Sequence, residues 1–319
     1  MIMAMAVLSA VLFSCVREEM TCDKELIVVQ RIGEGGYVYT RGAAISSNTD
    51  LKEETFGLYG SLTPNASVPQ PYFNASATVN ADLTATISPL QYWPGLLNAS
   101  MKFFSWYPYN DANAPTASFT DPGEMVLNYT ANASAANHVD VLAAISGPVW
   151  VEGVNILYHT LTKVTFTFKK VAPVPNEVTI EKIEFQNVGK SGNLAMTEIP
   201  TTTTKNGKPK FVWSDVATGK VVSTLTDNKT VTEDATLMGD TFLMLPTDAF
   251  SATAKIVVTT NFGDREFLFS DIIAKNPHSW ESGEYINYNL TISNETYQLS
   301  ATPLEWTESP VNVIFDKQY

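Results

Sequence analysis

The sequence predicts an all-β protein built from two tandem antiparallel β-sandwich domains. Short segments alternate between apolar and polar side chains along most of the chain, and turn-forming residues separate these segments at short intervals. No long stretch keeps the spacing of an amphipathic helix. Two packed sheets need strands with one apolar and one wet face, so this pattern favours sandwiches.

In the first half, strands are expected where short apolar alternation recurs. The clearest example is KVTFTFKK, which places Val164, Phe166 and Phe168 on one face and polar residues on the other. The expected strands cover residues 56–62, 84–90, 99–107, 124–130, 140–146 and 163–170.

The second half repeats the pattern and adds a hairpin. Between the runs AKIVVTT and REFLFSD, the connection NFGD supplies Asn, Gly and Asp, which tolerate the backbone angles of a tight turn. The expected strands cover residues 177–188, 210–214, 220–225, 241–246, 254–260, 265–271 and 285–293.

A chain of 319 residues is long enough for two such domains. The segment VAPVPNE at 171–177 carries two closely spaced prolines, which remove backbone donors and stiffen an extended linker. We therefore expect the division near Pro173, with an N-terminal sandwich at 42–172 and a C-terminal sandwich at 173–319.

Composition excludes several classes of function. A net charge of −13 argues against a nucleic-acid partner, because phosphates require clustered basic residues. The two cysteines, Cys15 and Cys22, cannot form a disulfide framework. The three histidines lack the spacing of metal ligands, and no nucleophile elbow or paired carboxylates stand out. We expect no enzymatic activity, no cofactor and no metal site.

The N-terminus carries a candidate export and lipidation signal. An apolar run ends at Cys15, and the stretch Leu12 to Cys15 matches the site where a lipoprotein signal peptidase cuts before a lipidated cysteine. We therefore expect a signal peptide at 1–14, a lipid on Cys15 and a membrane as partner. The alternative is an ordinary cleaved signal peptide with an incidental cysteine.

Several segments together resemble the fimbrillin-like subunits of Gram-negative anaerobes. They are VYTRGAAISSNTDLKEETFGLYGSL, QYWPGLLNASMKFFSWYPY, DVLAAIS, YHTLTKVTFTF and WESGEYINYNLTI, which occur in the order of the family and cover most of the chain. The resemblance implies transthyretin-like sandwiches and a lipoprotein precursor that reaches the outer membrane. It also implies assembly with other pilin subunits into a fimbrium that supports cell adhesion.

The resemblance further implies processing by an Arg-specific protease within a leader at 15–41. Arg41 is the candidate site, because small neighbours such as Gly42 leave the bond accessible, and Arg17 and Arg31 are competing sites. The removable strand would then be residues 24–31.

The strand that fills the vacated groove of a neighbour would be residues 310–315. In this stretch Val311, Val313 and Phe315 share one face, as an inserted strand requires. The alternative for this segment is an ordinary edge strand of its own domain. For the whole chain, the alternatives are a monomeric surface lipoprotein that binds host glycan or protein, and a pilus tip or anchor subunit.

Overall fold

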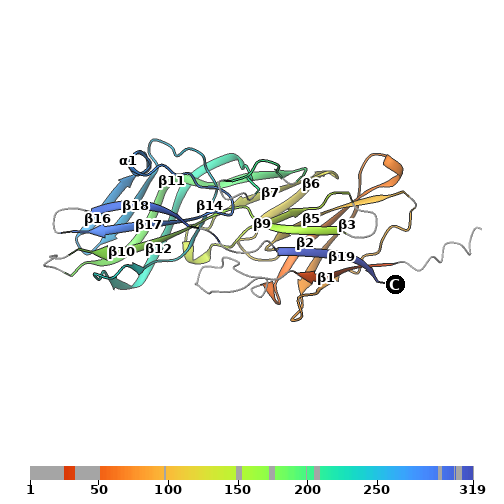
Figure 1. Ribbon diagram of the computed structural model, residues 1–319, viewed down its shortest axis with the longest axis horizontal. Coiled ribbons are helices and arrows are strands. Elements are labelled where there is room, and N and C mark those ends of the chain that lie inside the picture. The colour runs from red at the N-terminus through yellow and green to blue at the C-terminus, as the bar shows by residue number, and fades with distance from the viewer. Residues whose placement is uncertain are drawn as a thin grey trace, which may run out of the picture.

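The computed structural model describes residues 25–32, 51–96, 98–148, 153–171, 177–198, 200–204, 209–293, 297–304, 306 and 311–318. In this part the chain is all-β, in antiparallel sheets with one parallel strand pair, as the sequence predicts for the class. Figure 1 shows a closed sheet at one end of an elongated molecule and two facing sheets at the other.

The closed sheet has the strand order β1-β19-β9-β8-β5-β2-β3-β4, and β1 pairs back to β4 through Val29 and Ala85. Its strands are β1 (Leu26–Ile32), β2 (Thr55–Thr63), β3 (Gln70–Val79), β4 (Ala85–Ser88), β5 (Ser100–Tyr107), β8 (Leu142–Ile145), β9 (Gly153–His159) and β19 (Val311–Gln318).

The inside of the closed sheet is a hydrophobic core. Alternate residues of β1, β2, β3, β5 and β8 point inward, among them Leu58 of β2, Phe103 of β5 and Ile27 of β1, all at most 2% exposed. Trp93 closes the core with an edge-to-face contact to Phe103, with 5.8 Å between ring centroids. Alternation along the strands therefore produces this core directly.

The C-terminal half packs two sheets face to face. One contains β10 (Thr162–Lys170), β13 (Thr236–Leu237), β14 (Phe242–Met244), β17 (Tyr285–Ile292) and β18 (Tyr297–Leu304). The other contains β6 (Thr116–Asp121), β7 (Glu124–Thr130), β11 (Thr179–Met196), β12 (Ser214–Thr230), β15 (Lys255–Thr260) and β16 (Gly263–Leu268).

Aromatic rings fill the space between these two sheets. Phe185 of β11 lies 4.9 Å from Phe242, 5.6 Å from Phe166 and 5.3 Å from Trp280, measured between ring centroids. All four side chains are at most 1% exposed. Edge-to-face and tilted contacts of this kind add to the free energy of area burial.

Three local features differ from the sequence-based expectations. Residues 265–271, expected as a strand, divide between β16 and the short helix α1 (Phe269–Lys275), which buries Phe269 and Ile272 on one face. Residues 210–213 of the expected strand 210–214 lie outside any strand. β10 and β17 run parallel, because the chain crosses over between them rather than returning through a hairpin.

The hairpin at NFGD is confirmed, with Thr260 paired to Gly263.

The sheet pairing interleaves across the expected division near Pro173. β6 and β7 precede it but extend the β11 sheet, and β10 precedes it but pairs with β14 and β17. β19, at the other end of the chain, belongs to the closed sheet. β11 is 18 residues long, so its first part pairs with β15 and its last part pairs with β7 in the same sheet.

A third apolar cluster joins the two halves. The outer face of the closed sheet contributes Tyr59, Phe104 and Trp106, and the sheet of β7 and β11 contributes Leu127 and Leu194. These side chains are at most 4% exposed. The junction is therefore packed as a core, which restrains motion of one half against the other.

Gly57 shows how tightly this junction packs. A Cβ atom at Gly57 would lie 2.1 Å from Cε2 of Trp106, the residue paired with it across β2 and β5. We expect Gly57→Ala to lower the free energy of unfolding by about 1–3 kcal/mol through overpacking, measured by urea denaturation. Gly147→Ala is the matched control, because no heavy atom lies within 4 Å of a Cβ there. An equal effect of both substitutions would contradict this account.

His138 predicts an acid sensitivity at the same junction. The amide of Leu243 donates to its Nδ1 at 2.9 Å, and Nε2 lies 3.0 Å from the carbonyl oxygen of Asn132, so the neutral ring fits both partners. Burial lowers the pKa of His138 from 6.5 to about 4, with smaller opposing effects from its two backbone partners and Asp240.

A lowered pKa means that this stabilisation is complete above pH 6.5 and is lost as the pH falls toward 4. We expect wild type to lose about 3 kcal/mol more unfolding free energy than His138→Gln over this range, measured by urea titrations at each pH. Glutamine keeps one donor and one acceptor but does not titrate. Parallel pH profiles of the two proteins would show that His138 is not the titrating group.

Candidate functional site: the paired terminal strands

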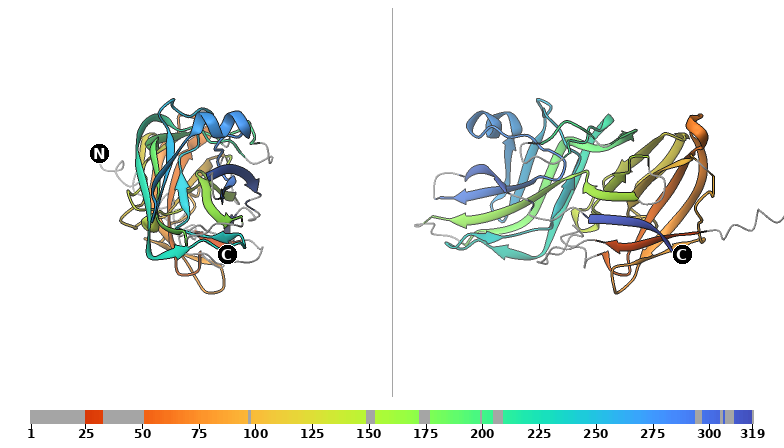
Figure 2. Two further views of the ribbon diagram at one scale, coloured as in Figure 1. Left: turned by 90° about the vertical axis from the view of Figure 1, so that its left-hand side faces the viewer. Right: turned by 45° about the vertical axis from the view of Figure 1, so that its right-hand side comes forward.

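The structure places the two terminal strands of the chain side by side. Figure 1 shows β19, near the C-terminus, along β1, near the N-terminus, and Figure 2 shows the same pair from a second direction. Cys15, Arg41 and Gly42 lie outside the described residues. The expected removable strand at 24–31 overlaps β1, and the expected donor residues Val311, Val313 and Phe315 lie in β19.

β1 closes the sheet with both its backbone and its side chains. Ile27 and Val29 are each 2% exposed and belong to the inner core. The amide of Ile27 donates to the carbonyl oxygen of Gln91 at 2.9 Å, and the amide of Trp93 donates to that of Glu25 at 2.8 Å. Loss of β1 would therefore open the ring of strands and expose the core beneath it.

β19 lies between β1 and β9 and pairs antiparallel with both. Its register to β1 runs from Val313 opposite Ile32 to Gln318 opposite Leu26, with an irregularity between Val29 and Arg31. Its register to β9 runs from Val311 opposite Leu157 to Phe315 opposite Gly153. The segment is thus an interior strand of the closed sheet, not an edge strand of the C-terminal sheets.

The register aligns the expected donor residues with core positions. Phe315 lies opposite Val29, and Val311 lies opposite Leu157, and both of these partners are buried in the inner core. Residues directly opposite each other in a ladder share a face of the sheet. Val311 and Phe315 are therefore in register with residues of the inner core.

Trp306 fixes the chain where it leaves the C-terminal half. Its ring is 2% exposed and stacks on His159, with 3.9 Å between centroids, while Nζ of Lys163 lies 5.4 Å from its centroid. Nδ1 of His159 lies 2.8 Å from Oδ2 of the buried Asp140. Trp306 precedes β19 by five residues, so this anchor sets the starting point of the terminal strand.

Sequence reasoning missed Trp306 and the position of β19. The only sequence signal for the anchor is an isolated tryptophan between two strand candidates, and its partners His159 and Lys163 lie more than 140 residues away along the chain. Contacts of such long range leave no periodic trace in a single sequence.

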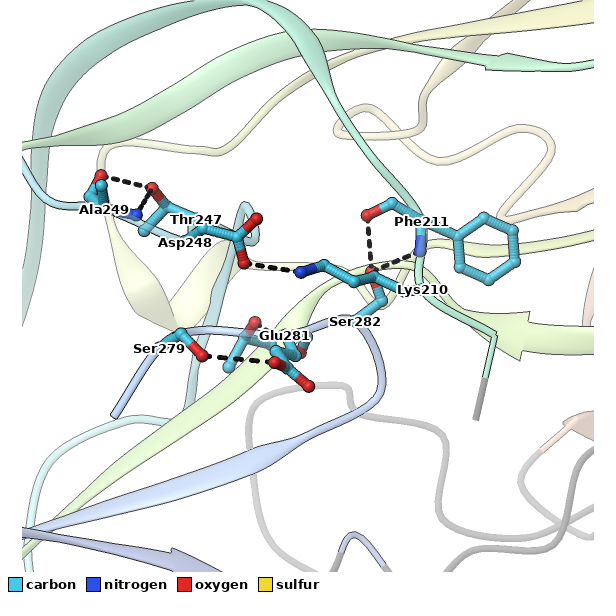
Figure 3. A network of polar contacts seen from close by, with 9 residues as sticks. Lys210, Phe211, Thr247, Asp248, Ala249, Ser279, Glu281 and Ser282 are labelled. Atoms are coloured by element: carbon cyan, nitrogen blue, oxygen red, sulfur yellow. Dashed lines mark hydrogen bonds and ion pairs between the residues drawn. The ribbon is translucent and has the colours of Figure 1, made fainter. Parts of the chain in front are cut away.

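A cavity of about 500 Å³ lies beside the start of β12. Its lining includes Trp280 and Phe250, the exposed Val212, and an ion pair in which Nζ of Lys210 lies 2.7 Å from Oδ1 of Asp248. Figure 3 shows this pair and the neighbouring Ser282, whose hydroxyl donates to the carbonyl oxygen of Phe211 at 3.1 Å. The hydrogen bond to Asp248 raises the pKa of Lys210. Mixed apolar and polar walls of this kind suit a small ligand.

Clusters of metal ligands and membrane-spanning helices are both absent from the described residues. No group of three or more His, Cys, Asp or Glu in this part of the chain is arranged to hold a metal ion. Within the same residues, no helix is both long and apolar enough to cross a membrane.

Solved structures share this fold at low sequence identity. A protein described as a cell adhesion protein from Bacteroides uniformis is 14% identical, with a TM-score of 0.55 over 88% of this chain and 98% of that chain. A fimbrial protein from Bacteroides vulgatus is 13% identical, with a TM-score of 0.54 over 79% and 93% of the two chains. No curated protein sequence matches this chain.

A family model described as fimbrillin-like matches residues 40–306. The matched region contains the C-terminal sandwich and every strand of the closed sheet except β1 and β19. This match supports a structural, fimbrial role at the cell surface. Because the match covers most of its length, the chain belongs to the fimbrillin-like family.

Proposed function

We propose that this chain is a pilus subunit that is exported as a lipoprotein and polymerised by protease-triggered strand exchange, in support of cell adhesion. Cys15 carries the lipid that holds the precursor at the outer membrane. An Arg-specific protease cuts between Arg41 and Gly42, and the C-terminal strand of one subunit then completes the closed sheet of the next.

The observation that carries the proposal is that β1 lies in the sheet beside β19. β1 precedes the expected cut after Arg41, so the cut separates all of β1 from the rest of the chain. A cut after Arg17 would leave β1 attached, and Arg31 lies within β1, in register with Ile314. Ladder pairing protects a backbone from proteolysis, which disfavours Arg31 as the site.

Departure of β1 weakens the hold on β19. With β1 present, β19 has a ladder on both sides, and without it only the ladder to β9 remains, from Val311 to Phe315. Each net hydrogen bond contributes on the order of 1 kcal/mol, so losing one ladder removes several kcal/mol of the interactions that keep β19 in its own sheet. The same cut uncovers the places of Ile27 and Val29 in the core, each side chain contributing about 1.5–3 kcal/mol when buried.

Exchange between copies is favourable only by a modest margin. A strand that moves from its own sheet to the same place in a neighbour regains the contacts that it lost, so domain exchange is a low-cost route to assembly. Association itself still costs an estimated 4–15 kcal/mol. Slow release after the sheet has closed around the donor strand would then keep the fibre intact.

A monomeric adhesin is the second candidate function, and the cavity beside β12 favours it. The cavity presents aromatic walls and the Lys210–Asp248 pair, which could hold a small ligand such as a glycan unit. Strand exchange and ligand binding use different surfaces of the chain, so failure to polymerise is the result that would favour this second function.

The first prediction concerns the cut. Mild trypsin treatment of the purified precursor should give one stable product that begins at Gly42, identified by intact mass and N-terminal sequencing. In Arg41→Gln this product should be absent, whereas Arg31→Gln, the matched control, should still give it. A stable product of Arg41→Gln with the same mass as that of wild type would contradict Arg41 as the site.

The second prediction tests strand exchange with a disulfide between the terminal strands. Val28 and Asp316 lie directly opposite each other, so Val28→Cys with Asp316→Cys, in a Cys22→Ser background, should join β1 to β19. After trypsin, wild type should form multimers that resist SDS. The oxidised double variant should stay monomeric, because the cut β1 remains attached to β19.

Reduction supplies the control within the same sample. Addition of a reductant should restore multimers of the double variant to the wild-type level, and each single cysteine variant should polymerise with or without it. Equal multimer ladders from the oxidised and the reduced double variant, with the disulfide verified by mass, would end the strand-exchange proposal.

A further inference from the structure

Five apolar side chains are exposed at the end of the closed sheet where β1 begins. Val68 is 81% exposed, Leu90 57% and Leu96 54%, while Tyr72 and Tyr92 are each 37% exposed. We name this set the apolar end. It lies at the extremity of the molecule where the chain also terminates, far from the facing sheets of the other half (Figures 1 and 2).

Neighbouring connections bring these residues together. Val68 lies in the loop from β2 to β3, and Leu96 lies in the loop from β4 to β5. Both loops adjoin the pair Thr63 and Ser100, where β2 and β5 meet. Tyr72, near the start of β3, donates its hydroxyl to the carbonyl oxygen of Tyr92 at 2.9 Å. Tyr92 lies in the loop from β4 to β5, so this hydrogen bond connects that loop to the strand that follows the other loop.

The loops that form the apolar end carry almost no charge. Between residues 55 and 101 the only charged residue is Asp82, which lies in the turn from β3 to β4. β3 starts at the apolar end and finishes at this turn, so Asp82 lies at the opposite end of the closed sheet. The neighbouring terminal strands do carry charges, with Glu25 just before β1, and with Asp316 and Lys317 of β19 in register with Val28 and Ile27. In a chain with 53 charged residues, this concentration of uncharged, exposed apolar surface is unusual.

The chain enters the closed sheet at the same end. The carbonyl oxygen of Glu25 accepts the amide of Trp93, and Leu26 forms a bridge with Tyr92. Cys15 precedes Glu25 by ten residues. Ten residues reach at most about 35 Å when fully extended, so a lipid on Cys15 would hold the apolar end close to the bilayer.

We propose that the apolar end is a membrane-contact surface, which rests on the interface of the outer leaflet while the precursor is lipidated. This inference rests on the proposed lipid attachment. Leu90, Leu96 and Val68 would enter the boundary between headgroups and acyl chains, and the Tyr rings are amphipathic in the way that membrane interfaces favour. The near absence of charge between residues 55 and 101 limits the cost of bringing charges out of water at these loops.

The placement links membrane release to assembly. The cut after Arg41 removes the lipid, the tether and β1 together, because all three precede it. The bare protein then keeps only the few exposed side chains of the apolar end, and contact of this size without a lipid is weak and reversible. The subunit therefore leaves the bilayer when its sheet opens.

The experiment places a fluorescent label at the apolar end and at a distant site. Leu90→Cys and Leu96→Cys are each made in the full chain with Cys22→Ser and labelled with an environment-sensitive dye. The matched control is Leu237→Cys, which replaces a leucine that is 47% exposed in β13 of the other half. The proteins are expressed with their own signal in a Gram-negative host fed radioactive palmitate. They are then reconstituted in phosphatidylethanolamine and phosphatidylglycerol vesicles that contain nitroxide-labelled lipid.

We expect palmitate on each protein and strong quenching at positions 90 and 96, about half of the emission or more, with about a tenth or less at position 237. Trypsin release should abolish the quenching. Palmitate without quenching at 90 and 96 would overturn the membrane contact and leave the proposed function intact. Absence of palmitate, with the same result in Cys15→Ala, would remove the lipid attachment and the contact together.

A second copy of the chain is the competing occupant of the apolar end. If it sits there, the dye at positions 90 and 96 should shift to shorter wavelength without vesicles, and the shift should grow with protein concentration. That result would overturn the membrane contact in favour of a subunit interface.

Discussion

The closed sheet depends on one strand that comes from the far end of the chain. β19 separates β1 from β9, and the ring of eight strands cannot close without it. The core inside this ring, which includes Phe56, Phe103 and Leu142, is therefore sealed by a segment that the chain supplies last. Everything between, including the whole C-terminal sandwich, must fold so that residue 311 arrives beside Leu157.

The junction between the halves meets this requirement. The cluster around Trp106 and Leu194 joins the closed sheet to the long strand β11, and Trp306 is buried at the same junction against His159. A packed junction fixes the distance from the end of β18 to the start of β19. A loosely linked pair of domains would leave the terminal strand to search for its place at an entropic cost.

Local pattern was enough to predict much of the fold. Alternation in segments such as KVTFTFKK and YINYNLTIS located β10 and β17, and the turn residues of NFGD located the hairpin of β15 and β16. These elements were predictable because their side-chain period and turn chemistry are properties of a few adjacent residues.

Pairing between distant segments was not predictable in the same way. The sequence of β10 does not predict that β17 pairs parallel to it, because an alternating strand can pair in either direction. The helix α1 replaced the end of an expected strand, because Phe269 and Ile272, three residues apart, both reach the same core. For the candidate site, the family resemblance indicated both strand segments and apolar alternation supported the donor segment, but their adjacency within one chain required the structure.

The adjacency of β1 and β19 affects when β19 can leave its own sheet, rather than how tightly it binds in one sheet or another. Contacts that β19 makes in its own sheet have counterparts in the sheet of a second copy, so equilibrium alone gives little preference for a polymer. What differs between the two states is β1, which holds β19 in place from one side and fills the core with Ile27 and Val29. A subunit that keeps β1 is closed, and its terminal strand is committed to itself. In the proposed mechanism, removal of β1 is irreversible because it breaks a covalent bond, so the strand would be released only once and only where the protease acts. In this mechanism the order of events is set by covalent chemistry rather than by the small difference between two equivalent places for the same strand, and slow release after the sheet has closed keeps the strand in its new place.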